Sequence, residues 1–281
     1  MAGTVSPSVK TGVALRRRAG RRRLRLDPAR LLPPVVSVLA VLALFELLPR
    51  VGIVSARQLP PSSEILDTFV SQLSNSAFWG DVWQTLQGWA LALAIAVAIA
   101  VPLGVLLGSS ALLYRSLRFV IEFLRPIPSV ALIPLVVLLY GTGLTSKVFL
   151  AAFGATWPLL IQVIYGVQDV DPVATDTGRM FGMNRFQRAL RITLPSTLPY
   201  AATGLRIAAT TALLLCVTGE LVIGAPGLGH AIDLARTSAA TTLMYAMILT
   251  TGLVGIAINV LFRRIERRAL RWHPSQREVA A

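Results

Sequence analysis

Runs of apolar residues separated by short polar segments dominate the chain. A bilayer core about 30 Å thick is crossed by a helix of roughly 20 apolar residues, so runs that approach this length are candidate spans. The candidates are residues 31–48, 85–107, 130–139 with a start as early as Leu117, 148–164, 201–223 and 242–261. The third run is the weakest. The pattern predicts an all-α polytopic helical bundle with about six transmembrane helices and both termini on one side.

Arginines gather in alternate connecting segments and predict the orientation. Basic residues in short loops are retained in the cytoplasm. With the N-terminus inside, the cytoplasmic segments hold the arginines of residues 16–25, Arg115 and Arg118, those of residues 179–191 and those of residues 263–271. The opposite segments hold Arg50 and Arg57 offset by Glu64, Asp67 and Asp81, then Lys147, then Asp233 with Arg236. Both termini are therefore expected in the cytoplasm, and omitting the third span would place residues 179–191 on the wrong face.

Composition agrees with a membrane protein. Of the 281 residues, 54% are hydrophobic and 14% are charged, with a net charge of +14. The basic residues lie beside apolar runs and not on aromatic-interleaved segments, so topology explains the charge better than nucleic acid does. Cys216 is the single cysteine, which excludes an internal disulfide. The basic start resembles an export signal, but Pro49-Arg50 follows the first apolar run without a small-residue cleavage pattern, which favours a retained span.

The expected organisation has four parts. Residues 1–30 form a basic, disordered cytoplasmic tail, residues 31–58 the first helix and a linker, residues 59–265 the main transmembrane part, and residues 266–281 a cytoplasmic tail. Within the third part, Pro60-Pro61-Ser62 is expected to open an interfacial helix with a serine cap. Gly104 and Gly108 predict close helix packing, within the chain rather than in a dimer.

Three prolines interrupt the third apolar run. Pro126, Pro128 and Pro134 leave backbone carbonyls without helical partners. Such breaks persist in a membrane where protein or a water-filled path satisfies those carbonyls. We therefore expect this segment to line a pathway.

The polar segment at residues 169–196 is built as two short capped helices. Asp171 can cap a helix that starts at Pro172 and runs to Phe181, and Gly182 can end it in the left-handed conformation. Asn184 can cap a second helix, which Leu194-Pro195 is expected to end, with Ser196 capping the next span. A segment with this many start and stop signals is not a flexible linker.

This segment resembles the cytoplasmic loop of importer permeases driven by ATP-binding cassette (ABC) subunits. The family pattern is Glu-Ala-Ala, three residues, Gly, nine residues, Ile-x-Leu-Pro. Gly182, Ile192, Leu194 and Pro195 match at that spacing, whereas Asp176, Thr177 and Gly178 stand at the Glu-Ala-Ala positions. The flanking sequences Leu124-Arg125-Pro126-Ile127-Pro128, Ile133-Pro134-Leu135, Gly204-Leu205-Arg206-Ile207-Ala208 and Gly227-Leu228-Gly229 resemble the nitrate, sulfonate and taurine branch.

The resemblance implies a type I ABC importer permease fold in the plasma membrane of a prokaryote. It also implies that the helix at residues 173–181 docks into a cytoplasmic ATPase, and it assigns the coupling role to Asp171, Pro172, Asp176, Thr177, Gly178, Gly182, Ile192, Leu194 and Pro195. The implied partners are two ATPase subunits, an extracytoplasmic substrate-binding protein, a second permease that is most simply a copy of this chain, and membrane lipid. The implied solute is nitrate, a sulfonate or taurine, with a vitamin precursor as the alternative.

Sequence motifs for chemistry within this chain are missing. A phosphate-binding loop needs a lysine after Gly-x-x-x-x-Gly, and neither Lys10 nor Lys147 stands in that context. His230 and His273 are single and far apart in sequence. We therefore expect no enzyme activity, no cofactor and no metal, with ATP used by a partner subunit. An ion-gradient carrier and a membrane-anchored regulatory protein are the alternative classes.

Glu220, near the outer end of the fifth apolar run, has two interpretations. Charge within a membrane is costly and marks a pathway or a partner. Glu220 either contacts the pathway or is solvated beside Gly219 or paired with Arg236.

Overall fold

The computed structural model describes residues 28–270, except for the side chains of residues 28–31, 34 and 35. The chain divides into two units, residues 1–44 and residues 45–281. The described residues of the first unit belong to helix α1 (Pro28–Arg50), which covers the first expected span. The expected basic tail before Pro28 and most of the C-terminal tail lie outside the described residues. Between residues 28 and 270 the regular structure is entirely helical, as predicted.

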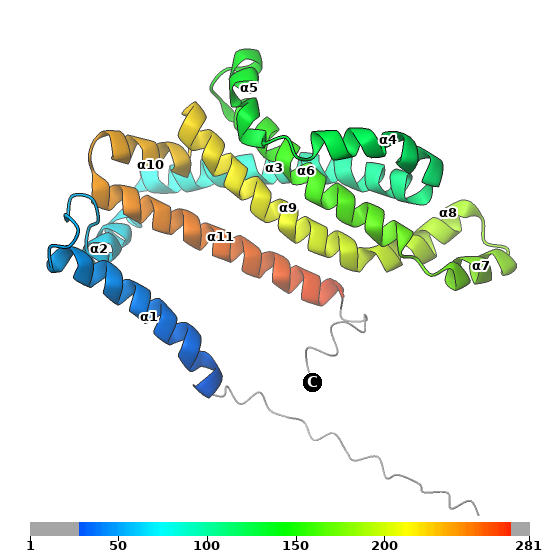
Figure 1. Ribbon diagram of the computed structural model, residues 1–281, viewed down its shortest axis with the longest axis horizontal. Helices are drawn as coiled ribbons and strands as arrows, with labels where there is room; N and C mark the ends of the chain where they lie inside the picture. The colour runs from blue at the N-terminus through cyan, green and yellow to red at the C-terminus, as the bar shows by residue number, and fades with distance from the viewer. Residues whose placement is uncertain (1–27, 271–281) are drawn as a thin grey trace, which may run out of the picture. The chain divides into compact units, whose positions relative to one another are not determined.

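Four long helices form the second unit (Figure 1). They are α3 (Ser76–Ser109), α6 (Leu144–Gln168), α9 (Leu194–Ile223) and α11 (Thr241–Ala269). Each is long and apolar enough to cross a membrane, which confirms the second, fourth, fifth and sixth expected spans as helices. Helix α6 packs along both α3 and α9, and small side chains such as Ala96, Ala155 and Ala212 are fully buried in the core that these helices share.

Glycines let α3 approach α6 closely. A Cβ atom on Gly104 would lie 2.7 Å from the Val163 side chain, and one on Gly108 would lie 2.6 Å from Val167. Both distances are shorter than a carbon–carbon contact allows. The predicted small-residue pair therefore serves packing within the chain.

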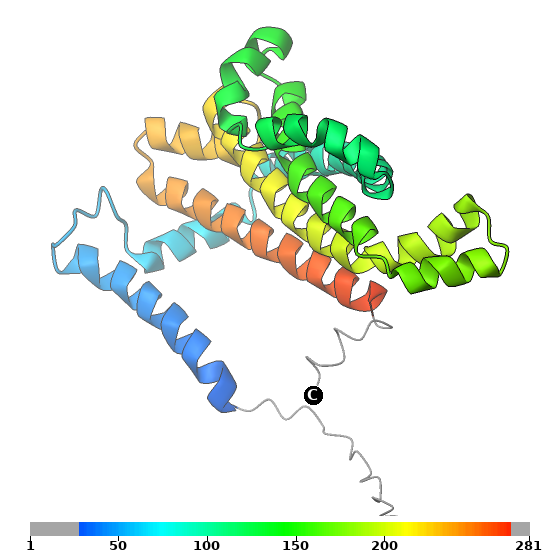
Figure 2. The same cartoon turned by 45° about the vertical axis from the view of Figure 1, so that its right-hand side comes forward.

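The two ends of this unit carry different short helices (Figure 2). One end has α2 (Ser62–Gln72) and α10 (Leu228–Thr237). The other end has α7 (Pro172–Met180), α8 (Arg185–Arg188) and the π-helical turn η2 (Ala189–Thr193). Between its ends, the chain from α3 to α6 folds as α4 (Ala111–Leu124), the 3-10 turn η1 (Ser129–Leu132) and α5 (Ile133–Tyr140).

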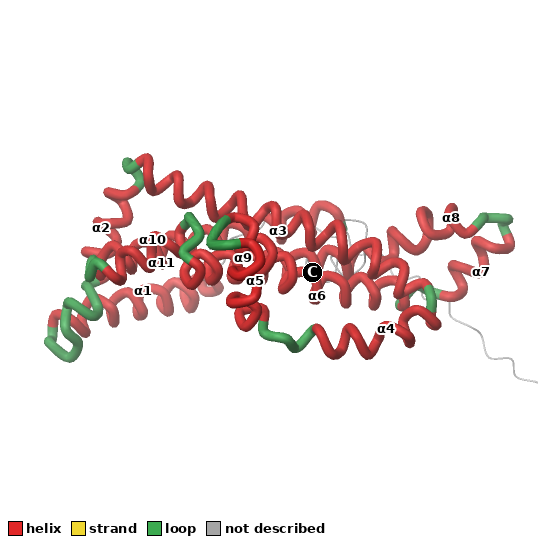
Figure 3. The backbone as a smooth tube through the Cα atoms, turned by 90° about the horizontal axis from the view of Figure 1, so that it is seen from above, coloured by secondary structure: helices red, strands yellow, loops and turns green. Residues whose placement is uncertain are grey.

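The third expected span is not one straight helix. Helix α4 and the η1–α5 segment meet at an angle of 79°, as in a broken span or a re-entrant loop. By length and composition, the described residues contain four helices that could cross a membrane, or five candidate spans if this pair is one. Figure 3 shows the connecting loop between α4 and α5. The break coincides with Pro126 and Pro128, which cannot donate backbone hydrogen bonds. Pro134, by contrast, lies in the first turn of α5, where proline is tolerated.

The expected serine cap of α2 is wrong. Its N-cap residue is Pro61, without a side-chain cap. The hydroxyls of Ser62 and Ser63 instead donate to the carboxylate of Glu46, at 2.9 and 3.0 Å, and the Ser63 N–H donates to it at 2.9 Å. A carboxylate accepts these hydrogen bonds better than a hydroxyl does, so the serines bind the end of α1 to the start of α2.

Candidate functional site

Helix α7 begins as the sequence predicts. The Asp171 carboxylate accepts a hydrogen bond from the Val173 N–H at 2.8 Å, and Pro172 occupies the first turn. Just before it, the Tyr200 hydroxyl on α9 donates to Asp169 at 2.6 Å. The cap satisfies a free N–H of the first turn, and the Tyr200 contact fixes the end of α6 beside α9. The start of α7 is therefore fixed by the Asp171 cap and by the contact between Tyr200 and Asp169 just before it.

Gly182 ends α7 in a Schellman motif. Its N–H donates to Arg179 O at 2.9 Å, and the Met183 N–H donates to Gly178 O at 3.0 Å. The motif requires a left-handed residue, and Gly182 has φ +72°. No atom lies within 4 Å of a Cβ built on Gly182, so the glycine is needed for its backbone conformation and faces open space.

The second short helix begins as predicted but does not end where predicted. Asn184 and Gln187 form a capping box, at 2.8 and 3.0 Å. The expected stop at Leu194-Pro195 and the expected cap by Ser196 are both wrong, because the backbone continues through η2 into α9. A π-turn changes the hydrogen-bond register, and this lets the chain pass Pro195, which lacks an N–H, without leaving the helix. The helix thus extends from Arg185 to Ile223.

Helix α7 packs on this extension through Gly178. Gly178 is buried, and a Cβ on it would lie 2.8 Å from Cδ1 of Ile192. Asp176 forms an exposed ion pair with Arg179 at 2.9 Å, and the Thr177 hydroxyl donates to Val173 O at 2.8 Å. Of the three residues at the Glu-Ala-Ala positions, Gly178 therefore packs inward, whereas Asp176 and Thr177 are exposed.

Large apolar side chains on the same segment are exposed. Met180 is 89% exposed, Phe181 79% and Phe186 76%. Exposed apolar side chains on a segment with defined caps are typical of a surface that another protein covers.

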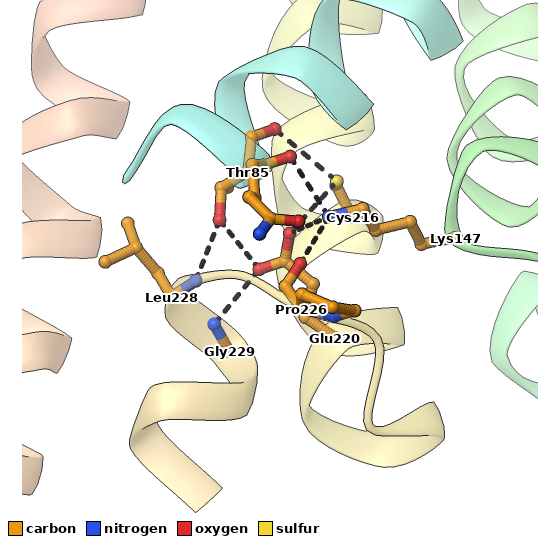
Figure 4. Close-up of polar contacts among 8 residues, drawn as sticks. Thr85, Lys147, Cys216, Glu220, Pro226, Leu228 and Gly229 are labelled. Atoms are coloured by element: carbon orange, nitrogen blue, oxygen red, sulfur yellow. Dashed lines mark hydrogen bonds and ion pairs between the residues drawn. The ribbon is translucent and has the colours of Figure 1, made fainter. Parts of the chain in front are cut away.

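At the other end of the unit, Lys147 and Glu220 form a buried ion pair (Figure 4). Their Nζ and Oε1 atoms are 2.7 Å apart, and both side chains are fully buried. The Lys147 ammonium also donates to Gln84 O at 3.0 Å and to Pro226 O at 2.6 Å. All three of its protons therefore have acceptors, as a buried ammonium requires.

The carboxylate of Glu220 is equally well satisfied. Its second oxygen accepts from the Thr85 hydroxyl at 2.8 Å and from the Gly229 N–H at 3.0 Å. Thr85 in turn accepts from the Leu228 N–H at 2.9 Å. A Cβ on Gly227, which has φ +146°, would collide with the Glu220 carboxylate. The pair and its partners connect α3, α6, α9 and the start of α10 (Figure 4).

This contact was missed by the sequence reasoning. Lys147 was expected in a polar loop, but α6 already begins at Leu144 and turns Lys147 toward α9. The expected pairing of Glu220 with Arg236, or its solvation, is wrong, because Arg236 pairs with Asp233 at 2.7 Å and Glu220 is buried. The sequence feature that could have revealed the pair is one lysine and one glutamate at the margins of two consecutive apolar runs, where each charge needs a partner.

The three prolines expected along a pathway are exposed. Their neighbours Arg125 and Ser129 line a cavity of about 330 Å³ against α6 and α9, whereas Glu220 does not line it. The part of the chain that the structure describes contains no group of three or more His, Cys, Asp or Glu residues that could hold a metal ion.

Comparison with known proteins identifies the family. Residues 100–271, more than half of the chain, match the family described as "Binding-protein-dependent transport system inner membrane component". The MetNI methionine ABC transporter, in an inward-facing crystal form, contains a chain of the same fold, with a TM-score of 0.61 and 22% identity, and the match covers 69% of this chain and 96% of that one.

Three characterised or named relatives are similar over most of their length. The putative aliphatic sulfonates transport permease protein SsuC of Bacillus subtilis (strain 168) is 29% identical, and the alignment covers 93% of each chain. The nitrate import permease protein NrtB of Leptolyngbya laminosa is 28% identical, with 86% of this chain and 88% of the relative covered. The taurine transport system permease protein TauC of Escherichia coli (strain K12) is 28% identical, with 79% of this chain and 82% of the relative covered. These relatives confirm the resemblance to the nitrate, sulfonate and taurine branch, and the chain belongs to the family of binding-protein-dependent transport system inner membrane components.

Proposed function

We propose that this chain is the permease subunit of an ATP-driven importer for a small oxyanion, with nitrate, a sulfonate or taurine as its solute. The family assignment and the relatives' transport names support the proposal. The structural observation that carries it is α7, a doubly capped helix with exposed Met180 and Phe181, rigidly packed on η2 through Gly178. Such a helix suits docking by a cytoplasmic ATPase.

The distribution of arginines supports the orientation. The end that bears α7 and α8 carries Arg179, Arg185, Arg188 and Arg191, and Arg263–Arg268 lie in the last part of α11. The end that bears α2 and α10 carries Arg236 paired with Asp233, and Lys147 is neutralised by Glu220. Basic segments remain in the cytoplasm, so the α7 end and both termini face the cytoplasm of a prokaryote and the protein spans its plasma membrane.

Coupling then follows from mechanical continuity. Helix α7 contacts Ile192, and the backbone from Arg185 through η2 into α9 is helical without interruption. Movement of a docked ATPase at α7 is therefore transmitted to α9, whereas a flexible loop would absorb it. ATP is bound and hydrolysed by that separate subunit, and this chain provides part of the solute path.

The complete transporter contains two permeases, two ATPases and an extracytoplasmic substrate-binding protein. A second copy of this chain is the simplest second permease. Lipid covers the remaining apolar surface, which includes exposed Leu138 and Leu139 on α5.

The test is gentle solubilisation of the tagged chain from its native host, followed by identification of the co-purifying subunits and by uptake of labelled nitrate, taurine and methanesulfonate. We expect an ATPase subunit and uptake that stops when ATP is depleted. Uptake that depends on an ion gradient, with no ATPase subunit present, would identify a secondary carrier. ATP-dependent uptake of a vitamin precursor in place of these anions would keep the permease role and refute the proposed solute.

A further inference from the structure

A cavity lies beside the proline break, and all of its polar lining residues can donate hydrogen bonds. It lies against the middle of α6 and α9, at the point where α4 gives way to η1. Its lining residues are Arg125, Ser129, Gly154, Trp157, Pro158, Ile207, Thr211, Leu214 and Leu215. The polar members can all donate hydrogen bonds, and none of the nine is acidic.

These donors lack partners among the residues that the structure describes. The indole N–H of Trp157 is buried without an acceptor. No hydrogen bond or ion pair to another described residue is present for the side chains of Arg125, Ser129 or Thr211. Arg118 pairs with Glu122 at 2.7 Å and Arg206 with Glu266 at 3.7 Å, whereas the buried Nε of Arg188 also has no partner among the described residues. The Trp157 N–H is the buried donor of this set, whereas Arg125 is exposed and Ser129 and Thr211 are half-buried. An unpartnered buried donor is costly, so the Trp157 N–H in this cavity indicates a ligand that supplies an acceptor.

The ligand chemistry follows from the donor set. A guanidinium carries a full positive charge and binds the oxygens of a planar or tetrahedral anion through two parallel N–H groups. Hydroxyl and indole donors add neutral hydrogen bonds, and the buried side chain of Leu215 supplies an apolar contact beside them. The volume of about 330 Å³ is at the lower end of the range for small-molecule sites, roughly 300 to 1,000 Å³.

We infer that this cavity is a binding subsite for a small oxyanion on its way through the permease, with Arg125 as the charged anchor and Trp157, Ser129 and Thr211 as neutral donors. The inference rests on the proposed function and deepens it by placing a solute contact within this chain. Trp157 lies near the middle of α6. Gly154 makes room for two side chains of the cavity lining, because a Cβ there would collide with Cδ1 of Leu215 and would lie 2.9 Å from the Ser129 hydroxyl.

The experiment measures anion binding directly. The permease–ATPase complex is purified in lipid nanodiscs without the substrate-binding protein, and nitrate, methanesulfonate and taurine are titrated by calorimetry, with urea as the neutral comparison. Loss of one charge-assisted contact weakens binding about tenfold, so Arg125→Gln is expected to raise the Kd of the bound anion by about that factor. Arg125→Lys retains the charge and is expected to retain part of the affinity. Trp157→Phe and Thr211→Val each remove one neutral donor and are expected to raise Kd about threefold.

Matched variants control for general damage. Arg118→Gln removes an arginine of α4, the helix that ends just before Arg125. Thr210→Val removes the hydroxyl of the residue before Thr211, and this Thr210 hydroxyl donates to Arg206 O at 3.1 Å. Neither residue lines the cavity, and both variants are expected to bind anions as the unaltered chain does. If Arg125→Gln does not fold, Arg125→Lys, Trp157→Phe and Thr211→Val still test the subsite.

The outcomes separate the subsite from the function. Anion binding by the unaltered complex that is equal in all cavity variants overturns the inference, even if ATP-driven uptake of the anion is intact. Absence of measurable anion binding in a complex that imports the anion also overturns it. Anion binding that weakens in the cavity variants supports the subsite, and uptake that does not need ATP would then refute the proposed function alone.

Discussion

The two ends of the second unit differ in whether their charged and apolar side chains are buried or exposed. At the α10 end, Lys147 and Glu220 are fully buried and every charged atom has a partner from the same chain. At the α7 end, the ion pair of Asp176 and Arg179 is exposed, and Phe181 remains 79% exposed.

This difference separates a contact that holds the chain together from a surface prepared for another protein. A buried pair is stable only when its geometry is complete, and removal of one member leaves a charge without compensation. An exposed pair contributes little to stability, and an exposed apolar group gains free energy only when something covers it. Substitutions at the α10 end should therefore change folding, and substitutions at the α7 end should change coupling.

The largest effect is expected at the buried pair. Lys147→Met or Glu220→Gln leaves one buried ionic group with an incomplete set of partners, which costs about 3–5 kcal/mol. We expect a lower thermal-unfolding temperature in detergent for each, and partial recovery in the double variant. Glu122→Gln, which removes the exposed pair with Arg118, is the control and should leave this temperature unchanged.

Uptake by Glu220→Gln also decides between the two roles of Glu220. If the variant folds and transports at the normal rate, Glu220 has no part in the pathway. Unfolding temperatures equal to that of the unaltered chain in both single variants would contradict the structural role.

A smaller effect is expected at Gly227. Gly227→Ala places a methyl group against the Glu220 carboxylate and requires a non-glycine residue at φ +146°, which costs roughly 1–3 kcal/mol. Gly141→Ala is the control, because Gly141 combines a positive φ of +73° with an extended ψ, as Gly227 does, but has open space around its Cβ. The unfolding temperature should fall more for Gly227→Ala than for Gly141→Ala. Equal decreases would show that the contact with Glu220 is unimportant.

The smallest effect on folding, and the largest on coupling, is expected at Gly182. Gly182→Trp places a bulky side chain in the open space at the end of α7, at a cost of about 1–2 kcal/mol for the left-handed backbone. We expect the subunit to insert and assemble, whereas ATP hydrolysis no longer drives uptake. Gly224→Trp has nearly the same backbone strain, because Gly224 is left-handed at φ +79° with open space around its Cβ, at the end of α9. A normal ratio of ATP hydrolysed to solute imported in Gly182→Trp would count against docking at α7.

Much of the fold and of the coupling segment could be predicted because the signals are local. Apolar run length identified the long helices, since the bilayer sets the length that a helix needs. Asp171, Gly182 and Asn184 have the predicted capping roles because a cap depends on residues within one turn. Their role in docking an ATPase remains a prediction.

Other features depended on contacts between distant parts of the chain. The stop at Pro195 failed because a π-turn in the preceding residues accommodates the proline, and composition does not reveal that change of register. The prolines predicted an interruption of the third span, but not the angle of 79° at which its two segments meet. The serines before α2 bond to Glu46, a partner sixteen residues away for Ser62, and not to their own helix.

The sequence by itself determined the family, the membrane-spanning helices and the caps of α7, because each is encoded in residues that are close together along the chain. Only the tertiary structure decided that Lys147 meets Glu220 and that Gly227 makes room for their contact, because these residues come from three separate segments. It likewise brought Arg125 and Trp157 to one cavity. A charged residue in an apolar run indicates that a partner is needed, but the packing of the helices determines which residue that partner is.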